Sequence, residues 1–195
     1  MPEINIHEKV AYEISKKYNL NSRDFFLGNL TPDAVNIDGF AAKEDRWASH
    51  LRKKNRNEWR EEVRKFYDKE KDNYNRDFIL GYITHILTDI IHDDYLYLKQ
   101  RKQIKKDYNC DNDKAHQILR EDMEKYRFKE WINIINILKS NNDYYDILNI
   151  NKELEQKWLN KKVLEYLDDN KSIYQTDEDL KVLILLVSDA LSSYL

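Results

Sequence analysis

The sequence predicts an all-α protein, and three observations support this fold class. Only 3 glycines and 2 prolines occur in 195 residues, too few for the turns of an all-β chain. Apolar residues recur at steps of three and four along most of the chain, which is the helical period. Hydrophobic residues make up 41% of the chain and aromatic residues 12%, which supports a packed core and disfavours disorder. We therefore expect a single helical domain over residues 1–195.

The first 71 residues divide into helices and one substantial loop. Ile6, Val10 and Ile14 recur at four-residue steps and define one face of a first helix. A short apolar helix follows and ends before Pro32, and the segment around Gly39 has few periodic apolar positions. A charged segment with widely spaced apolar positions comes next. The expected elements are helices over residues 6–18, 24–30 and 46–71, and a loop over residues 33–45.

The segment from Asp77 to Leu98 is the most informative part of the chain. Steps of three and four place six of its side chains on one helical face. Isoleucine and leucine cover the flanks, so we expect this face to turn inward and the helix to be apolar nearly all round. The six residues are Phe78, Tyr82, His85, Asp89, His92 and Leu96.

The rest of the chain predicts helices without evident chemistry. Residues 114–139 form a long periodic segment that becomes rich in isoleucine and leucine toward its end, and residues 140–143 are polar and turn-like. Further helices are expected over residues 154–167 and 180–195. The last of these is apolar enough to be a buried closing helix.

Charge and cysteine content exclude several classes of protein. With 33 Lys and Arg against 36 Asp and Glu, the net charge is −3 and the signs are mixed, so no nucleic-acid footprint is present. The single Cys110 excludes an intramolecular disulfide and a cysteine-based structural zinc site. No apolar run is long enough for a transmembrane segment. The N-terminal residues lack the apolar region of a signal peptide, so we expect a leaderless, cytoplasmic protein.

Four of the five histidines occupy positions that together favour a metal site, although each alone has a commoner structural explanation. His85 and Asp89 are four residues apart on one helical face, within reach of one cation. His92 lies two turns beyond His85, His7 points inward from the first helix, and His50 lies near the start of the charged segment. An ionised Asp89 on so apolar a face is costly unless it is paired or bound to metal. Such His/Asp sets suit zinc, with manganese or iron as alternatives, and an open coordination position makes them hydrolytic.

Several strings in this half of the chain resemble the zinc-dependent phospholipase C family, which is related to the S1/P1 nucleases. Together they are specific, and they occur in the family's order from residue 7 to about residue 92. The resemblance implies an all-helical bundle of the phospholipase C/P1 nuclease type with a cluster of zinc ions. The strings are His7-x-x-Val10-Ala11, FLGNLTPD at residues 26–33, Ser49-His50 and GYITHILTD at residues 81–89.

Residue by residue, the resemblance implies a ligand set for a first metal. His85 and Asp89 match the family's helical His-xxx-Asp pair, and Asp89 is expected to bridge two metals. His50 matches a further ligand to the first metal. Asp33 matches a carboxylate at that metal, which is also the candidate for activating the attacking water.

For the other metals the resemblance implies fewer ligands. His7 matches the ligand that the first helix contributes to a second metal, and His92 is the candidate for a third. The family's later His-xxx-Glu pair has no counterpart, because His116 is followed four residues later by Arg120. We therefore expect two zinc ions, or three with weaker oxygen ligands on the third.

The resulting prediction is a metal-dependent phosphoester hydrolase that acts on a small-molecule or lipid phosphoester. Three aromatic residues are candidates for a substrate groove, although each is expected to pack in the core: Phe40, Trp47 and Tyr82. Two alternatives remain open. The His92-Asp93 doublet is similar to that of HD-domain phosphohydrolases, in which Asp93 would be essential. The other alternative is a helical interaction module that keeps the fold and has lost part of the chemistry.

Overall fold

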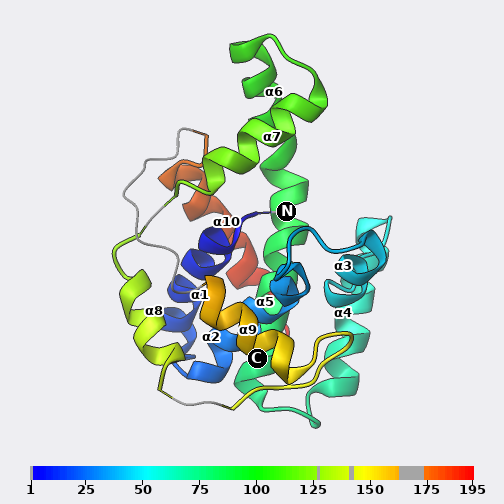
Figure 1. The fold of residues 1–195 in the computed structure, drawn as a ribbon, viewed down its shortest axis with the longest axis vertical. Helices are drawn as coiled ribbons and strands as arrows, with labels where there is room; N and C mark the ends of the chain where they lie inside the picture. Colours follow the sequence, from blue (N-terminus) through cyan, green and yellow to red (C-terminus); the bar gives the residue numbers. More distant parts are fainter. Residues whose placement is uncertain (1, 127, 141–142, 163–173) are drawn as a thin grey trace.

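The computed structural model describes residues 2–126, 128–140, 143–162 and 174–195, and its named elements there are all helical (Figure 1). The prediction of an all-α protein is confirmed. Within these ranges no helix has the length and apolar character that crossing a bilayer requires. The elements are α1 (Ile4–Tyr18), α2 (Arg23–Leu30), the 3₁₀ helix η1 (Thr31–Asn36), α3 (Lys43–Ser49), α4 (Arg56–Glu70), α5 (Arg76–Tyr95), α6 (Tyr97–Tyr108), α7 (Asn112–Met123), α8 (Trp131–Leu138), α9 (Lys152–Lys162) and α10 (Asp177–Ser192).

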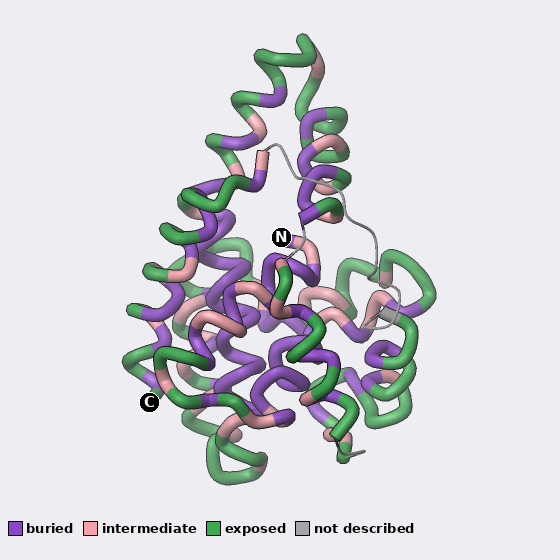
Figure 2. The backbone as a smooth tube through the Cα atoms, turned by 90° about the vertical axis from the view of Figure 1, so that its left-hand side faces the viewer, coloured by how far each residue is buried: buried purple, intermediate pink, exposed green. Residues whose placement is uncertain are grey.

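Helix α5 is the centre of the fold. The Asn75 side chain caps its first turn by accepting a hydrogen bond from the backbone N–H of Asp77. Every residue from Phe78 to Asp93 is buried, because α1, α2, α4 and α10 all pack against this helix. Figure 2 shows this buried core and the largely exposed α6–α7 hairpin that projects from it. The prediction of a helix that is apolar nearly all round, with its His/Asp face turned inward, is confirmed.

Two glycines allow α2 and α5 to cross in backbone contact. A Cβ atom at Gly28 would lie 2.0 Å from the carbonyl oxygen of Phe78, and one at Gly81 would lie 1.9 Å from that of Phe25. Because L-residues carry a Cβ atom, only glycine permits so close an approach. The crossing brings the end of α2, and the residues that follow it, against the middle of α5.

The predicted boundaries between residues 33 and 71 were wrong in two places. The expected loop contains most of η1, and the expected single charged helix is two helices, α3 and α4. The chain leaves helical geometry after α3, because Leu51 has a positive φ of 52°. Asn55 then caps α4 by accepting from the backbone N–H groups of Asn57 and Glu58. The break places His50 at the C-cap of α3.

In the second half of the chain, the long helix predicted over residues 114–139 is two helices, α7 and α8. The Asn5 side chain donates to the carbonyl oxygens of Met123 (2.8 Å) and Tyr126 (2.6 Å) and so satisfies backbone groups at the break. Helix α6 was not predicted, since it buries only Gln100 and Ile104 and so lacks a strong apolar period. The helices predicted over 154–167 and 180–195 correspond to α9 and α10, and residues 163–167 lie outside the described residues.

Helix α9 is anchored to the start of η1 through a buried carboxyl group. Glu155 accepts hydrogen bonds from the Thr31 hydroxyl and from the backbone N–H of Tyr145 at 2.8 Å. Burial raises the pKa of Glu155 from 4.5 to about 7, although these hydrogen bonds favour the charged form. Ionisation of Glu155 therefore works against folding.

The pH dependence of stability tests this contact. The pKa of Glu155 is higher in the folded state than in the unfolded state, so its protonated carboxyl group contributes to stability. This contribution is complete below pH 4.5 and is lost as the pH rises through about 7. Between pH 5 and 8 the free energy of unfolding of the wild type should therefore fall by about 2 kcal/mol more than that of Glu155→Gln. Urea unfolding of both proteins across this range measures the difference, and parallel pH profiles would contradict it.

Candidate metal centre

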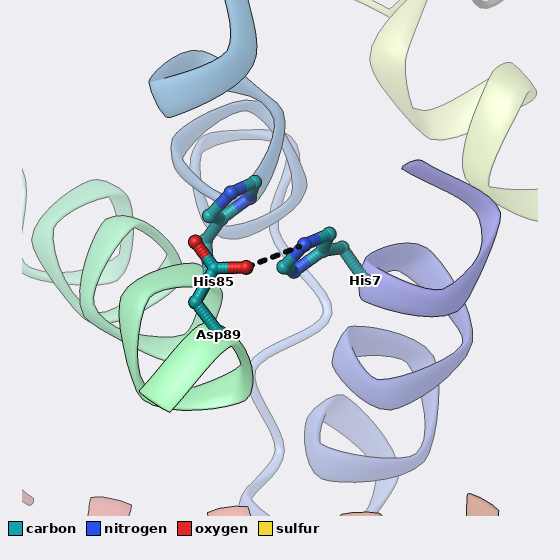
Figure 3. A group of neighbouring side chains, drawn as sticks. All are labelled: His7, His85 and Asp89. Carbon is teal, nitrogen blue, oxygen red and sulfur yellow. Dashed lines mark ion pairs between the residues drawn. The ribbon is translucent and has the colours of Figure 1, made fainter. Parts of the chain in front are cut away.

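Five of the six predicted site residues come together around the middle of α5 from four separate elements. Figure 3 shows three of them, with the imidazole of His7 on α1 facing the carboxylate of Asp89 on α5 and the His85 ring beside them. The rings of His7 and His85 are stacked with their centroids 3.7 Å apart. The five residues, which we call the His/Asp cluster, are His7 (α1), Asp33 (η1), His50 (the C-cap of α3), and His85 and Asp89 (α5).

Asp89 lies between two histidines from different elements. Its Oδ1 is 3.4 Å from Nε2 of His7, and its Oδ2 is 3.7 Å from Nε2 of His50. Asp33 approaches the same nitrogen of His50, with Oδ1 at 3.4 Å from Nε2, and its Oδ2 is 4.0 Å from Nε2 of His85. Ligands about 2.0–2.1 Å from a tetrahedral zinc ion lie roughly 3.3 Å from one another. The separations in the cluster are therefore close to those of a zinc coordination shell.

The donor atoms fall into two overlapping groups. Asp33, His50 and His85 form one and His7, His85 and Asp89 the other, and within each group the ligand atoms lie within 4.8 Å of one another. The two oxygens of Asp89 face different histidines. The two groups share His85, and either could hold a metal ion.

Backbone carbonyl groups fix the orientation of two of the histidines. Nδ1 of His85 donates to the carbonyl oxygen of Asn29 at 2.7 Å, and Nδ1 of His50 donates to that of Arg46 at 2.9 Å. A carbonyl oxygen only accepts, so Nδ1 carries a proton in both rings, and Nε2 has the free lone pair whenever the ring is neutral. This outer hydrogen bond is the usual partner of a metal-ligating histidine.

Six further donor atoms of the cluster, on His7, His50, His85 and Asp89, are buried and have no hydrogen-bond partner in the part of the chain that the structure describes. They are Nε2 of His50 and His85, both ring nitrogens of His7 and both carboxylate oxygens of Asp89. Buried polar groups are costly when unsatisfied, and most proteins avoid more than a few. Bound cations would satisfy the carboxylate oxygens and one lone pair on each imidazole ring, so the residues fit a metal.

The electrostatics of the cluster favour the protonation states that metal binding needs. Burial alone would raise the pKa of Asp33, but contact with His50 and the neighbouring imidazoles lower it to about 2. The pKa of Asp89 is held well below its usual value against burial by contact with His7 and the other histidines. Burial, with His7 beside it, lowers the pKa of His85 to about 3. The carboxylates are thus ionised and His85 is neutral at pH 7.

The pKa of His50 reflects the negative potential inside the cluster. Burial alone would lower its pKa, but contact with Asp33 and the charge of Asp89 raise it. The same two carboxylates that attract a proton to this ring would attract a metal cation.

Two further buried polar residues, Glu8 and Asn29, lie next to histidines of the cluster, and neither was predicted from the sequence. Glu8 is fully buried next to His7 in the chain, and burial raises the pKa of its carboxyl group. The side-chain amide of Asn29 forms hydrogen bonds at both ends when its nitrogen donates to Glu8 Oε1 (3.2 Å) and its oxygen accepts from the backbone N–H of His85 (3.2 Å). The pair ties α1 and α2 to α5 at the level of the cluster. One feature of the sequence could have identified Glu8, because it is a charged residue on the inward side of an amphipathic helix.

The other predicted site residues lie apart from the cluster or at its edge. His92 is buried, and burial lowers its pKa to about 3, but it belongs to neither group of donor atoms. Tyr82 is buried and donates to the backbone carbonyl oxygen of Ser49, and Trp47 is half-buried. The expectation that Phe40 packs in the core was wrong, because its side chain is 63% exposed.

Comparison with known proteins adds one finding to this geometry. The sequence model of the family described as zinc dependent phospholipase C matches residues 5–180. This range includes every residue of the cluster and most of the helices around it. Comparisons with curated proteins and with solved structures gave no match.

Proposed function

The chain belongs to the zinc-dependent phospholipase C family, and on that premise we propose that the His/Asp cluster binds zinc and hydrolyses a phosphoester. The observation that carries the proposal is the set of buried imidazole and carboxylate atoms that have no hydrogen-bond partner among the described residues. The donor chemistry suits zinc, and manganese and iron are alternative occupants. The substrate is a phosphodiester or phosphate ester of a small molecule or a lipid.

Each residue of the cluster has a proposed role. Asp33, His50 and His85 would hold a first ion and His7 a second, and Asp89, whose oxygens face different histidines, would contribute to both. His85 belongs to both groups of donor atoms, but it would hold only the first ion, because its Nε2 has one lone pair. His92 is a candidate ligand to a third ion.

Asp33 has the role nearest to the reaction. Bound zinc lowers the pKa of water and neutralises charge on phosphoryl oxygens. The side chain of Asp33 is 14% exposed, whereas those of the four other residues in the cluster are at most 1% exposed. Solvent therefore reaches the cluster at Asp33, whose ionised carboxylate accepts a hydrogen bond from the attacking water and directs its lone pair toward phosphorus.

A combined metal and activity measurement tests this proposal. Protein purified without an affinity tag should contain zinc by elemental analysis and should hydrolyse bis-p-nitrophenyl phosphate. Chelation should abolish the hydrolysis, and added zinc should restore it. Protein that lacks metal and stays inert after loading with zinc or manganese would support the interaction module instead.

A substitution at Asp93 separates the proposal from an HD-domain phosphohydrolase. Asp93 forms an ion pair with Arg52, with 2.9 Å between Oδ2 and Nη2, and lies 3.8 Å from Arg56. Asp93→Asn should therefore keep metal content and activity within about 3-fold of the wild type and cost about 1 kcal/mol of stability. A 100-fold loss of activity in folded, metal-loaded protein would favour the HD mechanism.

A further inference from the structure

The opening of the cluster to solvent is bounded by the chain that follows Asp33. The amide of Asn36 donates to Oδ1 of Asp33 at 3.3 Å, and its oxygen accepts from the backbone N–H of Ala41 at 3.2 Å. This amide therefore fixes the segment between η1 and α3 directly beside the one carboxylate of the cluster that solvent reaches.

Arg46 extends from the next helix to the same place. Its Nε donates to the carbonyl oxygen of Ala41 at 3.1 Å, and its own carbonyl oxygen holds the ring of His50. Burial and the nearby charge of Arg52 lower the pKa of Arg46, and the charge of Asp33 opposes this effect. The guanidinium group thus lies within the electrostatic field of the cluster.

Arg46 forms no ion pair with any residue that the structure describes. Within the described ranges no carboxylate lies within 4.0 Å of its guanidinium group, and its two terminal nitrogens make no hydrogen bond to a described residue. Arg120 differs, because it is paired with Glu3 at 3.1 Å and Glu124 at 3.4 Å. The two terminal nitrogens of Arg46, near the opening of the cluster, thus have N–H donors without a hydrogen-bond acceptor among the described residues.

The exposed Phe40 ring supports both guanidinium groups. The guanidinium carbon of Arg46 lies 4.2 Å from the ring centroid, and that of Arg120 lies 5.0 Å from it. An exposed aromatic ring can bind a quaternary ammonium group, but this one already holds two cations. The surroundings of Phe40 therefore disfavour a positively charged substrate group.

We propose that Arg46, supported by Phe40, binds an anionic group of the substrate at the opening of the His/Asp cluster. The preferred substrates are phosphoesters with a negative charge beyond that of a simple diester, such as phosphate monoesters or diesters of an anionic alcohol. A guanidinium group binds two oxygens of such an anion side by side and repels the ammonium group of a choline ester. The inference rests on the proposed hydrolytic function of the cluster.

Substitution of Arg46 by glutamine tests the inference. In zinc-loaded protein, Arg46→Gln should raise the KM for p-nitrophenyl phosphate by about 10- to 100-fold. It should change the KM for p-nitrophenyl phosphorylcholine by less than about 3-fold, because that substrate has no second anionic charge. Inorganic phosphate, measured by calorimetry without turnover, should bind more weakly by a factor similar to the first. Arg46→Lys should give intermediate values, since it keeps the charge but not the paired donors.

The control is Arg64→Gln. Arg64 is an arginine of α4 that donates to Ser193 near the end of the chain, and its loss should change none of these values. Equal phosphate affinity in the wild type and Arg46→Gln would overturn the inference, as would loss of zinc from Arg46→Gln. If the proposed function itself is wrong, the wild-type protein will neither retain zinc nor hydrolyse either ester.

Discussion

Replacement of Asp89 by asparagine is expected to reduce the hydrolysis of bis-p-nitrophenyl phosphate by about 1000-fold or more, with loss of bound zinc. Asp89 presents one oxygen to His7 and the other to His50. Asparagine preserves the shape of the side chain but removes its charge and one acceptor oxygen, so it cannot bridge two cations. Elemental analysis and steady-state kinetics measure the two effects.

Thermal unfolding gives a test of the same substitution that does not depend on turnover. Zinc at 100 times its dissociation constant should stabilise the wild type by about 3 kcal/mol and Asp89→Asn by much less. Asp94→Asn is the matched control, because Asp94 lies on the same helix and pairs with Arg60 away from the cluster. An Asp89→Asn protein that keeps full zinc content and activity would exclude the proposed bridging role.

The second large effect is expected from a change at the crossing of α2 and α5. Gly81→Ala would place a methyl group 1.9 Å from the carbonyl oxygen of Phe25, which is backbone and cannot turn aside. Separating the two helices would also weaken the Asn29–His85 hydrogen bond, one turn further along α5. We expect a loss of about 3 kcal/mol or more in the free energy of unfolding.

Gly39→Ala is the comparison for this prediction. Gly39 has a φ of 116°, but no atom lies within 4 Å of the place that a Cβ atom would take, so backbone strain alone should cost about 1 kcal/mol. Urea unfolding of both variants ranks the two effects. A Gly81→Ala protein as stable as Gly39→Ala would show that the helices separate at little cost.

The sequence predicted the helical fold because its strongest signals are local. The apolar period of α1 and the all-round apolar character of α5 needed no knowledge of distant contacts. The breaks that were missed depend on single backbone groups. One is the positive φ of Leu51, and another is the contact of Asn5 with Tyr126, which is 121 residues away in the chain. Neither leaves a periodic pattern.

The candidate site could be predicted as a set of side chains but not as a geometry. His85 and Asp89 share a helical face by their spacing, and the family resemblance added Asp33 and gave His7 and His50 their places in the ligand set. The hydrogen bonds that orient His85 and His50 come from the carbonyl groups of Asn29 and Arg46, which have no side-chain signature. The partners of such groups follow only from the three-dimensional packing.

Anomalous diffraction at the zinc edge, from crystals of the zinc-loaded protein, tests most directly whether the cluster is a metal centre. The expected result is a peak between Asp33, His50 and His85, about 2.0–2.1 Å from both Nε2 atoms, and a second peak between His7 and Asp89. Zinc bound only at surface residues such as His116, with no peak in the cluster, would contradict the proposal.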